Sequence, residues 1–461
     1  MNISLPSRYE DLEEAYRGRL IPNENLNELV QKAVKSMSIS GGIRFLPIYG
    51  ESGSGKSCAS REIDRHLPET CVFLLERDEI EDGNKLLERI EKEKKSDDKC
   101  LIAVVDQFEE QVSGKEDLPS QFIEKLSIYD RNQLKNVPII FIWLTTSKKF
   151  QETLQISTSR NRRILLEKDF EIKGPTVDSW PSIIQETFTF HNSEKPLSDY
   201  NVVEEDLYTV CENVVTVGEA LGTVGELLSK RIPSLQNLSE YRVILVWPVA
   251  DGTRMQRVLQ FSRPREGYLL NWDAWRRELN EQDRKTLPLQ QYNQTRLYFD
   301  FRIVPVRVAD IHKLCENLDE DPEKFAKTYT DWFQKTHLYQ LLYGNWDNYK
   351  YTPVKERESK RATAAKDWYL SVTSQPTKVG RRLALVLRQL GENAEYEKEI
   401  SSKYSKVKAD IFIEASDQNT KKQIVELKVY SSENTMPSSI KEQVKITLKR
   451  HAQLAGFIPR Q

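Results

Sequence analysis

A stretch of eight residues near the start of the sequence, GESGSGKS, fits the pattern GxxxxGK[ST] of loops that bind phosphate. In such a loop the glycines let the backbone curl, so that its N–H groups point at a β-phosphate. Lys56 would then reach the β- and γ-phosphate oxygens, and the Ser57 hydroxyl would bind Mg²⁺. The residues expected to contact nucleotide here are Gly50, Gly53, Ser54, Gly55, Lys56 and Ser57. The pattern predicts that the chain binds ATP together with Mg²⁺.

The residues on both sides of this loop suit it. Residues 43–49, IRFLPIY, predict a strand, although Pro47 is unusual in a central strand because it has no N–H. Residues 57–66 predict the helix that follows the loop. A loop of glycines and serines that fitted the pattern by chance would not be expected to have these flanks.

A second apolar run ends on an acid, as a Mg²⁺-assisted site requires. Residues 101–106, LIAVVD, predict a strand closed by Asp106, whose carboxylate would hold the Mg²⁺ shell through water. Glu109 and Glu110 follow at the mouth of the same site. They are candidates for the catalytic base that activates the attacking water.

Two further apolar runs predict the remaining strands. They are residues 71–75, CVFLL, and residues 137–144, VPIIFIWL. The second run ends on Thr145 and Thr146, which could sense the γ-phosphate. Arginines follow at positions 160, 162 and 163, where a cation could neutralise charge on the transferred phosphoryl group in this subunit or a neighbour. The alternative for these arginines is a solvated basic loop.

This order of strand, loop, helix, strand, helix, strand with Asp, helix and strand with Thr resembles the AAA+ and STAND branch of P-loop NTPases, over residues 25–235. The sequence DQFEE, which begins at Asp106, is especially similar to STAND signalling ATPases. The resemblance implies a parallel α/β sheet with a helical lid. AAA+ proteins commonly have Glu directly after the Asp, whereas this chain has Gln107, which implies slow ATP hydrolysis.

Asp410, Glu426 and Lys428 form a second group that could do chemistry. Asp410 belongs to a strand predicted at residues 409–415, and the other two belong to a strand predicted at residues 423–430. The polar residues between the strands predict a hairpin. Such a hairpin would bring the three side chains to one place.

The geometry of this hairpin suits metal chemistry. Centred on residues 418–419, it places Asp410 opposite residues 427–428. The period of two along a strand puts Glu426 and Lys428 on one face. Two carboxylates could hold Mg²⁺, which activates water for phosphodiester hydrolysis, while the lysine orients the nucleophile.

An Asp on one strand with Glu-x-Lys on the next resembles the PD-(D/E)xK nuclease superfamily. The resemblance implies that Asp410, Glu426 and Lys428 are catalytic and that Asp410 and Glu426 bind the metal. It also implies a restriction-endonuclease-like α/β domain. The alternative is an ordinary amphipathic hairpin with a chance Glu-x-Lys sequence.

The residues around the hairpin predict the helices of such a domain. Residues 378–390 predict a leading helix, which lacks the glutamate that many family members use as an extra metal ligand. Residues 439–454 predict a following helix with a capping box from Ser439 to Glu442. Gln443 matches a supporting position in the family. The chain stops at residue 461, which is short for a full nuclease core.

Charge is distributed unevenly along the chain. The net charge is −2, but residues 350–461 carry 22 Lys+Arg against 13 Asp+Glu, or +9, which leaves −11 for residues 1–349. A basic module on an acidic body indicates a nucleic-acid contact confined to one end. Lys441, Lys445 and Lys449 have helical spacing and are candidates for phosphate contacts. We therefore expect DNA to bind the carboxyl-terminal module.

The five cysteines and five histidines have no metal-binding spacing, so they indicate neither a structural zinc site nor a disulfide framework. The start of the chain lacks the pattern of a signal peptide. The longest apolar run has the length of one buried strand rather than of a membrane-spanning helix. We therefore expect a cytoplasmic protein.

These patterns together predict an α/β chain with several domains, which 461 residues can accommodate. The expected parts are a P-loop NTPase core with an N-terminal helical segment at residues 1–175, a helical lid at 176–235, a mixed α+β middle region at 236–350, a charged linker at 351–374 and a nuclease-like domain at 375–461. In the middle region Trp272 and Trp275 lie on one predicted helix with two arginines. We expect these tryptophans to pack a core, the alternative being a clamp on nucleic acid.

The expected function is an ATP-regulated, Mg²⁺-dependent DNA nuclease. The combination of these two resemblances is similar to bacterial anti-phage or anti-plasmid defence effectors, which implies a homo-oligomer and a partner protein of the same defence system. Two alternatives stay open. One is a DNA-binding regulator or loader with an inactive nuclease-like module, and the other is a nucleotide-gated assembly scaffold.

Overall fold

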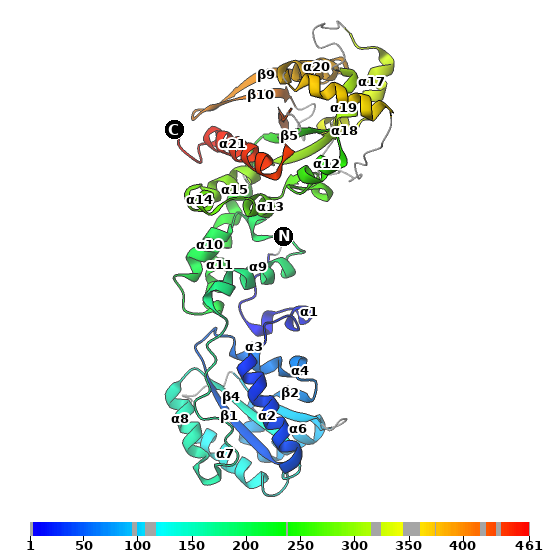
Figure 1. The fold of residues 1–461 in the computed structure, drawn as a ribbon. Coiled ribbons are helices and arrows are strands. Elements are labelled where there is room, and N and C mark those ends of the chain that lie inside the picture. Colours follow the sequence, from blue (N-terminus) through cyan, green and yellow to red (C-terminus); the bar gives the residue numbers. More distant parts are fainter. Residues whose placement is uncertain are drawn as a thin grey trace. The chain divides into compact units, whose positions relative to one another are not determined.

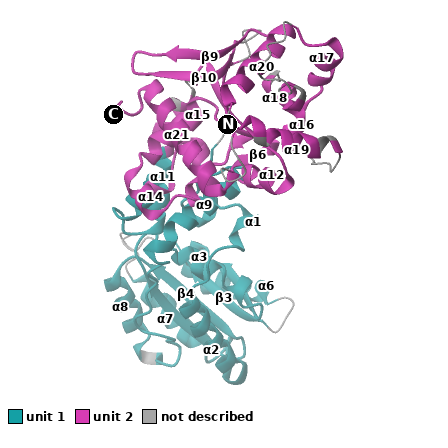
Figure 2. Cartoon of the chain, turned by 45° about the horizontal axis from the view of Figure 1, so that its top comes forward, with its two compact units in different colours: residues 1–197, 206–227 teal, residues 198–205, 228–461 magenta. Residues whose placement is uncertain are grey.

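The computed structural model describes residues 3–94, 99–106, 117–236, 238–314, 324–343, 360–373, 375–414, 421–429 and 435–460. The chain forms two compact units, which Figure 2 shows in different colours. Unit 1 consists of residues 1–197 and 206–227, and unit 2 consists of residues 198–205 and 228–461. The chain therefore passes from one unit to the other three times.

Unit 1 is built on a parallel sheet with the strand order β1-β4-β3-β2 (Figure 1). The strands are β1 (Ile43–Tyr49), β4 (Ile139–Thr145), β3 (Cys100–Val105) and β2 (Thr70–Leu74). Every residue of β1, β3 and β4 is buried. Their nearly unbroken apolar sequences follow from this, because helices cover both faces of a parallel sheet. The strands predicted from the four apolar runs are confirmed.

Two layers of helices enclose this sheet. One face packs against α2 (Glu24–Ser40) and α4 (Ile63–His66). The other packs against α6 (Gly83–Glu93), α7 (Leu118–Tyr129) and α8 (Lys148–Ser157). The helix predicted at residues 57–66 is divided at Glu62 into α3 (Lys56–Arg61) and α4.

Pro47 lies in the middle of β1. One edge of this strand pairs with β4. Along the other edge, residues 164–172 run parallel to β1 but form isolated bridges at Phe45 and Tyr49. Pro47, between these bridges, has no N–H to donate. The Gln151 side chain instead donates to the carbonyls of Pro47 and Phe170, at 3.0 and 2.9 Å. Proline is tolerated here because this edge has no continuous ladder, and the Gln151 amide satisfies the carbonyl of Pro47.

Three helices follow the sheet along the chain, at the positions predicted for a helical lid. They are α9 (Trp180–His191), α10 (Glu204–Cys211) and α11 (Val217–Arg231). At the amino end, the short helix α1 (Glu14–Arg17) packs against α9, where the hydroxyls of Tyr16 and Thr187 form a buried hydrogen bond at 2.9 Å. The residues before the first long helix are thus part of the core of unit 1.

Unit 2 is built on a mixed sheet with the strand order β6-β7-β8-β5-β11-β10-β9. The strands are β5 (Tyr241–Val249), β6 (Ser262–Arg263), β7 (Leu269–Leu270), β8 (Arg302–Arg307), β9 (Ala394–Ser401), β10 (Lys406–Ile413) and β11 (Lys422–Leu427). β5 pairs in parallel with β8 on one side and with β11 on the other. The four earlier and the three later strands of unit 2 therefore join, at β5 and β11, into one sheet.

This pairing corrects the domain division expected from the sequence. Residues 236–350 and 375–461 are not separate domains, because β5 and β11 pair over six residues. Part of the linker expected at residues 351–374 is also structured, since α19 (Lys360–Val372) buries Ala365, Tyr369 and Val372 in the core of unit 2. Contacts between such distant stretches leave no local pattern in the sequence.

Both helices predicted beside the hairpin are present. α20 (Pro376–Gln389) covers one face of the sheet, and α21 (Pro437–Ala455), red in Figure 1, covers the other. α21 begins two residues earlier than predicted, with Met436 as its N-cap. The capping box predicted from Ser439 to Glu442 is therefore absent.

Several shorter helices complete unit 2. α12 (Gly252–Leu259) is capped by Asp251, whose side chain accepts from Arg254 N at 2.9 Å. α17 (Lys327–Phe333) and α18 (His337–Tyr343) follow further along the chain. Trp272 and Trp275 of α13 (Trp272–Arg277) are buried, which confirms that they pack a core.

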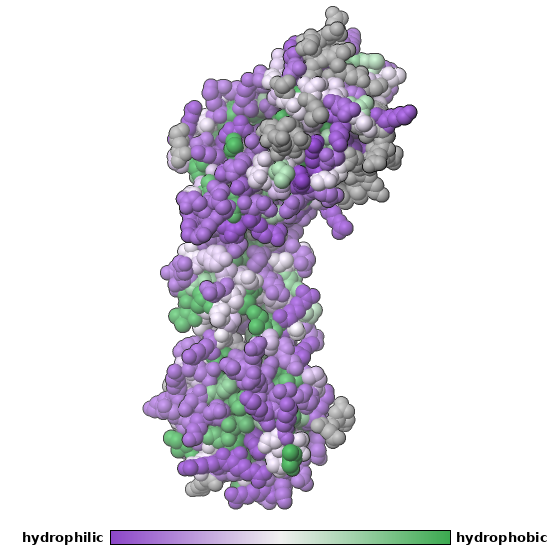
Figure 3. Space-filling view, viewed as in Figure 1, coloured by the Kyte–Doolittle hydropathy of each residue, from purple (hydrophilic) through white to green (hydrophobic). Residues whose placement is uncertain are grey.

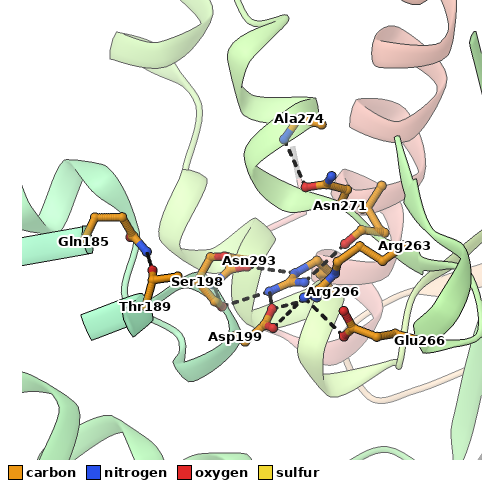
Figure 4. A network of polar contacts seen from close by, with 11 residues as sticks. Gln185, Thr189, Ser198, Asp199, Arg263, Glu266, Asn271, Ala274, Asn293 and Arg296 are labelled. Atoms are coloured by element: carbon orange, nitrogen blue, oxygen red, sulfur yellow. Dashed lines mark hydrogen bonds and ion pairs between the residues drawn. The ribbon is translucent and has the colours of Figure 1, made fainter. Parts of the chain in front are cut away.

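Residues 198–205, the anchored segment, belong to unit 2 although unit 1 contains the residues before and after them. Asp199 accepts from Arg263 at 2.7 and 2.8 Å and from Arg296 at 3.1 Å (Figure 4). The Ser198 carbonyl accepts from Arg296 at 2.8 Å. Although burial raises the pKa of Asp199, the two arginines hold it below its ordinary value.

A second pair of contacts fixes the end of the anchored segment. Arg276 of α13, whose side chain is 8% exposed, forms ion pairs with Glu204 and Glu205. Val203 also packs in an apolar core of unit 2, so both ion pairs and apolar packing hold the anchored segment there.

The face drawn in Figure 3 is mainly hydrophilic over both units, with scattered apolar residues. Among the described residues, no helix is both long enough and apolar enough to cross a membrane.

Candidate nucleotide and metal sites

The phosphate-binding loop joins β1 to α3 at the carboxyl end of the parallel sheet. Gly53 and Gly55 have φ angles of +80° and +87°, in the left-handed region that glycine adopts most readily. A Cβ on Gly50 would lie 2.8 Å from Ser54 Oγ and 2.7 Å from the Ile172 carbonyl. Glycine at all these positions is therefore required for the loop to close tightly.

Lys56 folds back over this loop. Its ammonium donates to the carbonyls of Gly50 and Glu51, at 2.6 and 2.8 Å. Phosphate oxygens would be stronger, charged acceptors for the same donor. Ser54 Oγ is buried and has no hydrogen-bond partner within the described residues, and Ser57 is half-buried in the first turn of α3. These features fit a nucleotide phosphate, which would bring the missing acceptors.

Two further segments close around the loop, one at Gly174 and the other at the start of α11, which belongs to the predicted lid. Gly218 N, in the first turn of α11, donates to the Gly53 carbonyl at 3.1 Å. A Cβ on Gly53 would lie 2.6 Å from Thr216 Oγ1, and one on Gly174 would lie 2.7 Å from the Ser54 carbonyl. α11 is thus a direct neighbour of the loop. The glycines at 174 and 218 are the features that could have indicated these contacts.

The acid and the threonine predicted at the sheet edge lie at the ends of neighbouring strands. Tyr49 pairs with Thr145, and Val105, just before Asp106, pairs with Trp143. Ligands of open α/β sheets bind at this carboxyl edge. The Thr145 hydroxyl accepts from Ser147 N at 2.9 Å, so contact with a γ-phosphate would require this bond to be exchanged or shared.

Asp106 forms an ion pair with a residue of α3. Its Oδ2 lies 2.7 Å from Arg61, and the same guanidinium lies 2.8 Å from Glu10 Oε1. The Tyr9 ring lies against Arg61, with 5.2 Å between the guanidinium carbon and the ring centroid. A Mg²⁺ shell at Asp106 would therefore share this carboxylate with Arg61. The amino-terminal residues contact the predicted site through this arginine.

Of the other residues predicted for the ATPase, the structure describes Arg163 but not the two candidate bases. Glu109 and Glu110, the predicted bases, lie outside the residues that the structure describes. Arg163 donates to the Ser40 carbonyl at 3.3 Å, near the start of β1. The phosphate-binding loop follows the opposite end of that seven-residue strand. The role expected for Arg163 within its own subunit is therefore wrong, because an extended strand of this length separates it from the loop.

β10 and β11 form the predicted antiparallel hairpin, but the register differs by one residue. Ile411 pairs with Val425. Continuing this register places Asp410 opposite Glu426 rather than opposite residues 427–428. Asp410 Oδ2 still reaches the next residue, where it accepts from Leu427 N at 2.7 Å. The predicted centre of the hairpin lies in residues 415–420, outside the described residues.

Glu426 is the centre of a buried polar cluster. Its Oε2 accepts from Arg450 at 2.6 Å, from Lys428 at 2.7 Å and from Thr447 at 3.3 Å. Its Oε1 is buried and accepts no hydrogen bond within the described residues, and His451 Nδ1 lies 4.0 Å away. Although burial raises the pKa of Glu426, the cations around it lower the value to about 2. Glu426 is therefore ionised at neutral pH.

Asp410 forms the open side of this cluster. Its side chain is exposed, whereas Glu426 and Lys428 are 2% and 5% exposed. Partial desolvation raises the pKa of Asp410, and the charge on Glu426 adds to this, while the Leu427 N–H lowers it. A bound cation would favour the ionised form of both carboxylates.

The two carboxylates fit Mg²⁺. They supply the hard oxygen ligands that this ion prefers, and Glu426 Oε1 is a buried oxygen without a hydrogen-bond partner within the described residues. In the described part of the chain, no group of three or more His, Cys, Asp or Glu could hold a metal. One or two carboxylates are sufficient for Mg²⁺ when water and substrate phosphates complete its shell. The structure thus brings the three predicted residues together.

Three residues of α21 complete the cluster and were missed by the sequence analysis. Thr447, Arg450 and His451 are three and four residues apart and so share one face of the helix. His451 Nδ1 donates to the Thr447 carbonyl at 2.9 Å, and burial lowers the pKa of the ring, which keeps it neutral. This spacing on an already predicted helix could have identified them.

Two of the lysines expected to contact phosphate are paired within the chain. Lys441 and Lys445 lie 3.7 and 3.4 Å from Asp283, and 3.1 and 2.7 Å from Glu442. Lys449 is exposed. Asp283 and Glu442 balance the charge of Lys441 and Lys445, which reduces the attraction of these two lysines for phosphate.

Glu426→Gln is expected to lower stability in a pH-dependent way. The folded-state pKa of about 2 lies below the ordinary value of 4.5, so ionised Glu426 stabilises the fold above pH 4.5 and loses this effect as the pH falls toward 2. The shift corresponds to about 3 kcal/mol. In urea unfolding followed by tryptophan fluorescence, the parent should exceed the variant by about this amount at pH 7 and by less than half of it at pH 3. A difference that stays constant between these pH values would contradict the assignment.

Comparison with known proteins gives distant structural matches. No protein-family model matches the sequence, and no curated protein matches it significantly. The Aeropyrum pernix ORC2 protein in its ADP form matches with a TM-score of 0.33 and 9% identity, over 80% of this chain and 89% of that chain. The ADPNP-ADP complexes of the same protein match with a TM-score of 0.31 and 12% identity, over 72% and 87%. Scores this low support no conclusion about this chain.

Proposed function

We propose that the protein is a Mg²⁺-dependent DNA nuclease whose activity is controlled by ATP at the phosphate-binding loop. The observation that carries the proposal is the meeting of Asp410, Glu426 and Lys428 on two paired strands. Two carboxylates and an ammonium at one place are the groups that metal-assisted phosphodiester hydrolysis requires. The basic charge of residues 350–461 supports a polyanionic substrate.

Each residue has a separate part in this proposal. Asp410 and Glu426 would hold Mg²⁺, which when bound lowers the pKa of water and stabilises negative charge at phosphorus. Lys428 has three N–H donors, one of which is directed to Glu426 Oε2. A second donor could orient the attacking water. Glu426 thus positions Lys428 as well as the metal.

ATP binding is proposed from the loop itself. Left-handed Gly53 and Gly55, the ammonium of Lys56 and the unpartnered hydroxyl of Ser54 support a phosphate site. Ser57 and Asp106 would hold the accompanying Mg²⁺. Slow hydrolysis with Glu109 or Glu110 as base remains a prediction. Contact between α11 and the loop supports nucleotide control, because a helix that touches the loop can respond to its occupant.

A cleavage assay on supercoiled plasmid tests the proposal directly. The parent protein should cut the plasmid with Mg²⁺ and stop when EDTA is added. The rate should differ between samples with and without ATP. If no condition gives cleavage while the protein binds both ATP and DNA, the nuclease assignment fails.

One observation favours a second candidate, a DNA-binding regulator or loader without nuclease activity. Glu426 is already paired with Lys428 and Arg450, as a purely structural carboxylate would be. Such a protein would bind the plasmid and leave it intact.

The biological setting is proposed on resemblance alone. A nuclease under nucleotide control resembles bacterial defence against phage or plasmid DNA. In this proposal the protein forms a homo-oligomer and acts with a partner protein of the same system. Purification from the host with associated proteins retained, followed by mass spectrometry, tests both points.

A further inference from the structure

Arg450 connects the buried cluster to solvent. One of its nitrogens lies 2.6 Å from Glu426 Oε2, yet its side chain is 43% exposed while that of Glu426 is 3% exposed. Lys428, on the same oxygen, is 7% exposed. A guanidinium has five N–H donors in a planar fork, so one contact leaves others directed elsewhere. Of these two cations, Arg450 is the one that a ligand from solvent can reach.

The charges of the cluster disfavour a metal while Arg450 stays on Glu426. Asp410 and Glu426 supply two negative charges, which Lys428 and Arg450 balance. A divalent cation would enter a group without net charge and would lie close to two cations that repel it. Movement of Arg450 away from Glu426 would leave a net negative charge and would release one acceptor position on Oε2.

We propose that Arg450 exchanges between Glu426 and a phosphodiester of DNA, and that this exchange admits Mg²⁺ to Asp410 and Glu426. The inference rests on the proposed nuclease function and specifies how the substrate controls the same site. A phosphodiester offers two anionic oxygens to the guanidinium fork. Glu426, in contrast, accepts from one nitrogen of Arg450 through a single oxygen. DNA therefore competes well for Arg450, and metal loading follows DNA binding.

The surroundings of Arg450 support this substrate class. Lys449, the preceding residue on α21, is exposed, and residues 350–461 carry a net charge of +9. A backbone phosphate would thus be attracted to the same end of the chain. An exchange of this kind also keeps the site without metal until DNA is present.

The test compares Arg450→Ala, Arg450→Gln and Lys449→Ala with the parent, each in the full chain. Lys449→Ala is the matched control, because it removes one positive charge from the neighbouring position. Mg²⁺ binding without DNA is measured by isothermal titration calorimetry. DNA binding is measured by fluorescence anisotropy of a short labelled duplex in EDTA. The effect of DNA on metal binding is measured with Ca²⁺ in place of Mg²⁺, in samples with and without the duplex.

Both Arg450 variants are expected to bind Mg²⁺ roughly tenfold more tightly than the parent in the absence of DNA, because a repelling charge is gone. Both should bind DNA more weakly than Lys449→Ala, because they lose a bidentate contact. The parent should bind Ca²⁺ more tightly when the duplex is present, and Arg450→Gln should show no such gain.

Three outcomes would overturn the exchange. They are unchanged or weaker Mg²⁺ binding in both Arg450 variants, DNA affinity equal to that of Lys449→Ala, and metal affinity of the parent that does not respond to DNA. Arg450→Gln keeps an amide donor for Glu426, so a folding defect of Arg450→Ala alone does not decide the result. A parent protein that never cleaves DNA contradicts the nuclease function but leaves the exchange intact, since binding alone reports it.

Discussion

Asp410→Asn is expected to reduce DNA cleavage by at least about 100-fold, the loss typical of removing one group that stabilises developing charge. The side chain is exposed, and its Oδ2 accepts from Leu427 N at 2.7 Å. Asparagine can keep this hydrogen bond through its carbonyl oxygen but loses the charge that would hold Mg²⁺. The fold, ATP binding and DNA binding should therefore persist while cleavage is lost.

Glu399→Gln is the matched control for this substitution. Glu399 is exposed on β9 of the same sheet, where it pairs with Lys406 at 2.9 Å. An exposed pair of this kind contributes little to stability. The control should cut DNA at the parental rate in the plasmid assay. If Asp410→Asn also cuts at that rate, the hairpin is not a nuclease site.

Lys56→Ala is expected to weaken ATP binding by about 100-fold, because charged hydrogen bonds to phosphate contribute about 3 kcal/mol. The same substitution removes the bonds from the Lys56 ammonium to the carbonyls of Gly50 and Glu51. Plasmid cleavage by this variant should no longer change when ATP is added. Equilibrium titration with a fluorescent ATP analogue measures the first effect, and the plasmid assay measures the second.

Lys32→Ala provides the control for loss of a lysine in unit 1. Lys32 is exposed on α2 and pairs only loosely with exposed Glu28, at 3.4 Å. This variant should bind ATP as the parent does. If Lys56→Ala binds ATP with unchanged affinity, the loop at residues 50–57 does not bind the ATP phosphates. Cleavage that still responds to ATP in that variant would instead rule out nucleotide control through this loop.

Both candidate sites could be predicted because their central residues are close in the sequence. The loop residues from 50 to 57 are contiguous, so their pattern does not depend on the rest of the fold. Glu426 lies on β11 and Lys428 directly follows the strand, so their spacing of two residues places both side chains on one face. Predicting that Asp410 lies beside Glu426 required only the assumption of a hairpin. The predicted register was wrong by one residue, but this error did not separate the two side chains.

The partners of these residues could not be predicted, because they come from distant parts of the chain. Arg61 reaches Asp106 across 45 positions, and no local pattern requires it. β5 pairs with β11, although an intervening stretch contains most of unit 2. Arg450 is different, since its helical spacing from Thr447 was available in the sequence. Its contact with Glu426 depended on which face α21 presents to the sheet.

The anchored segment limits how this chain can be cut or rearranged. A fragment that began at residue 228 would contain Arg263, Arg276 and Arg296 but would lack Asp199, Glu204 and Glu205. Arg296 is buried, and removing the carboxylate of a buried ion pair such as Asp199–Arg296 destabilises a protein by about 3–5 kcal/mol. A continuous piece of sequence that contains all of unit 2 would therefore have to begin at residue 198, and it would carry residues 206–227 of unit 1 with it.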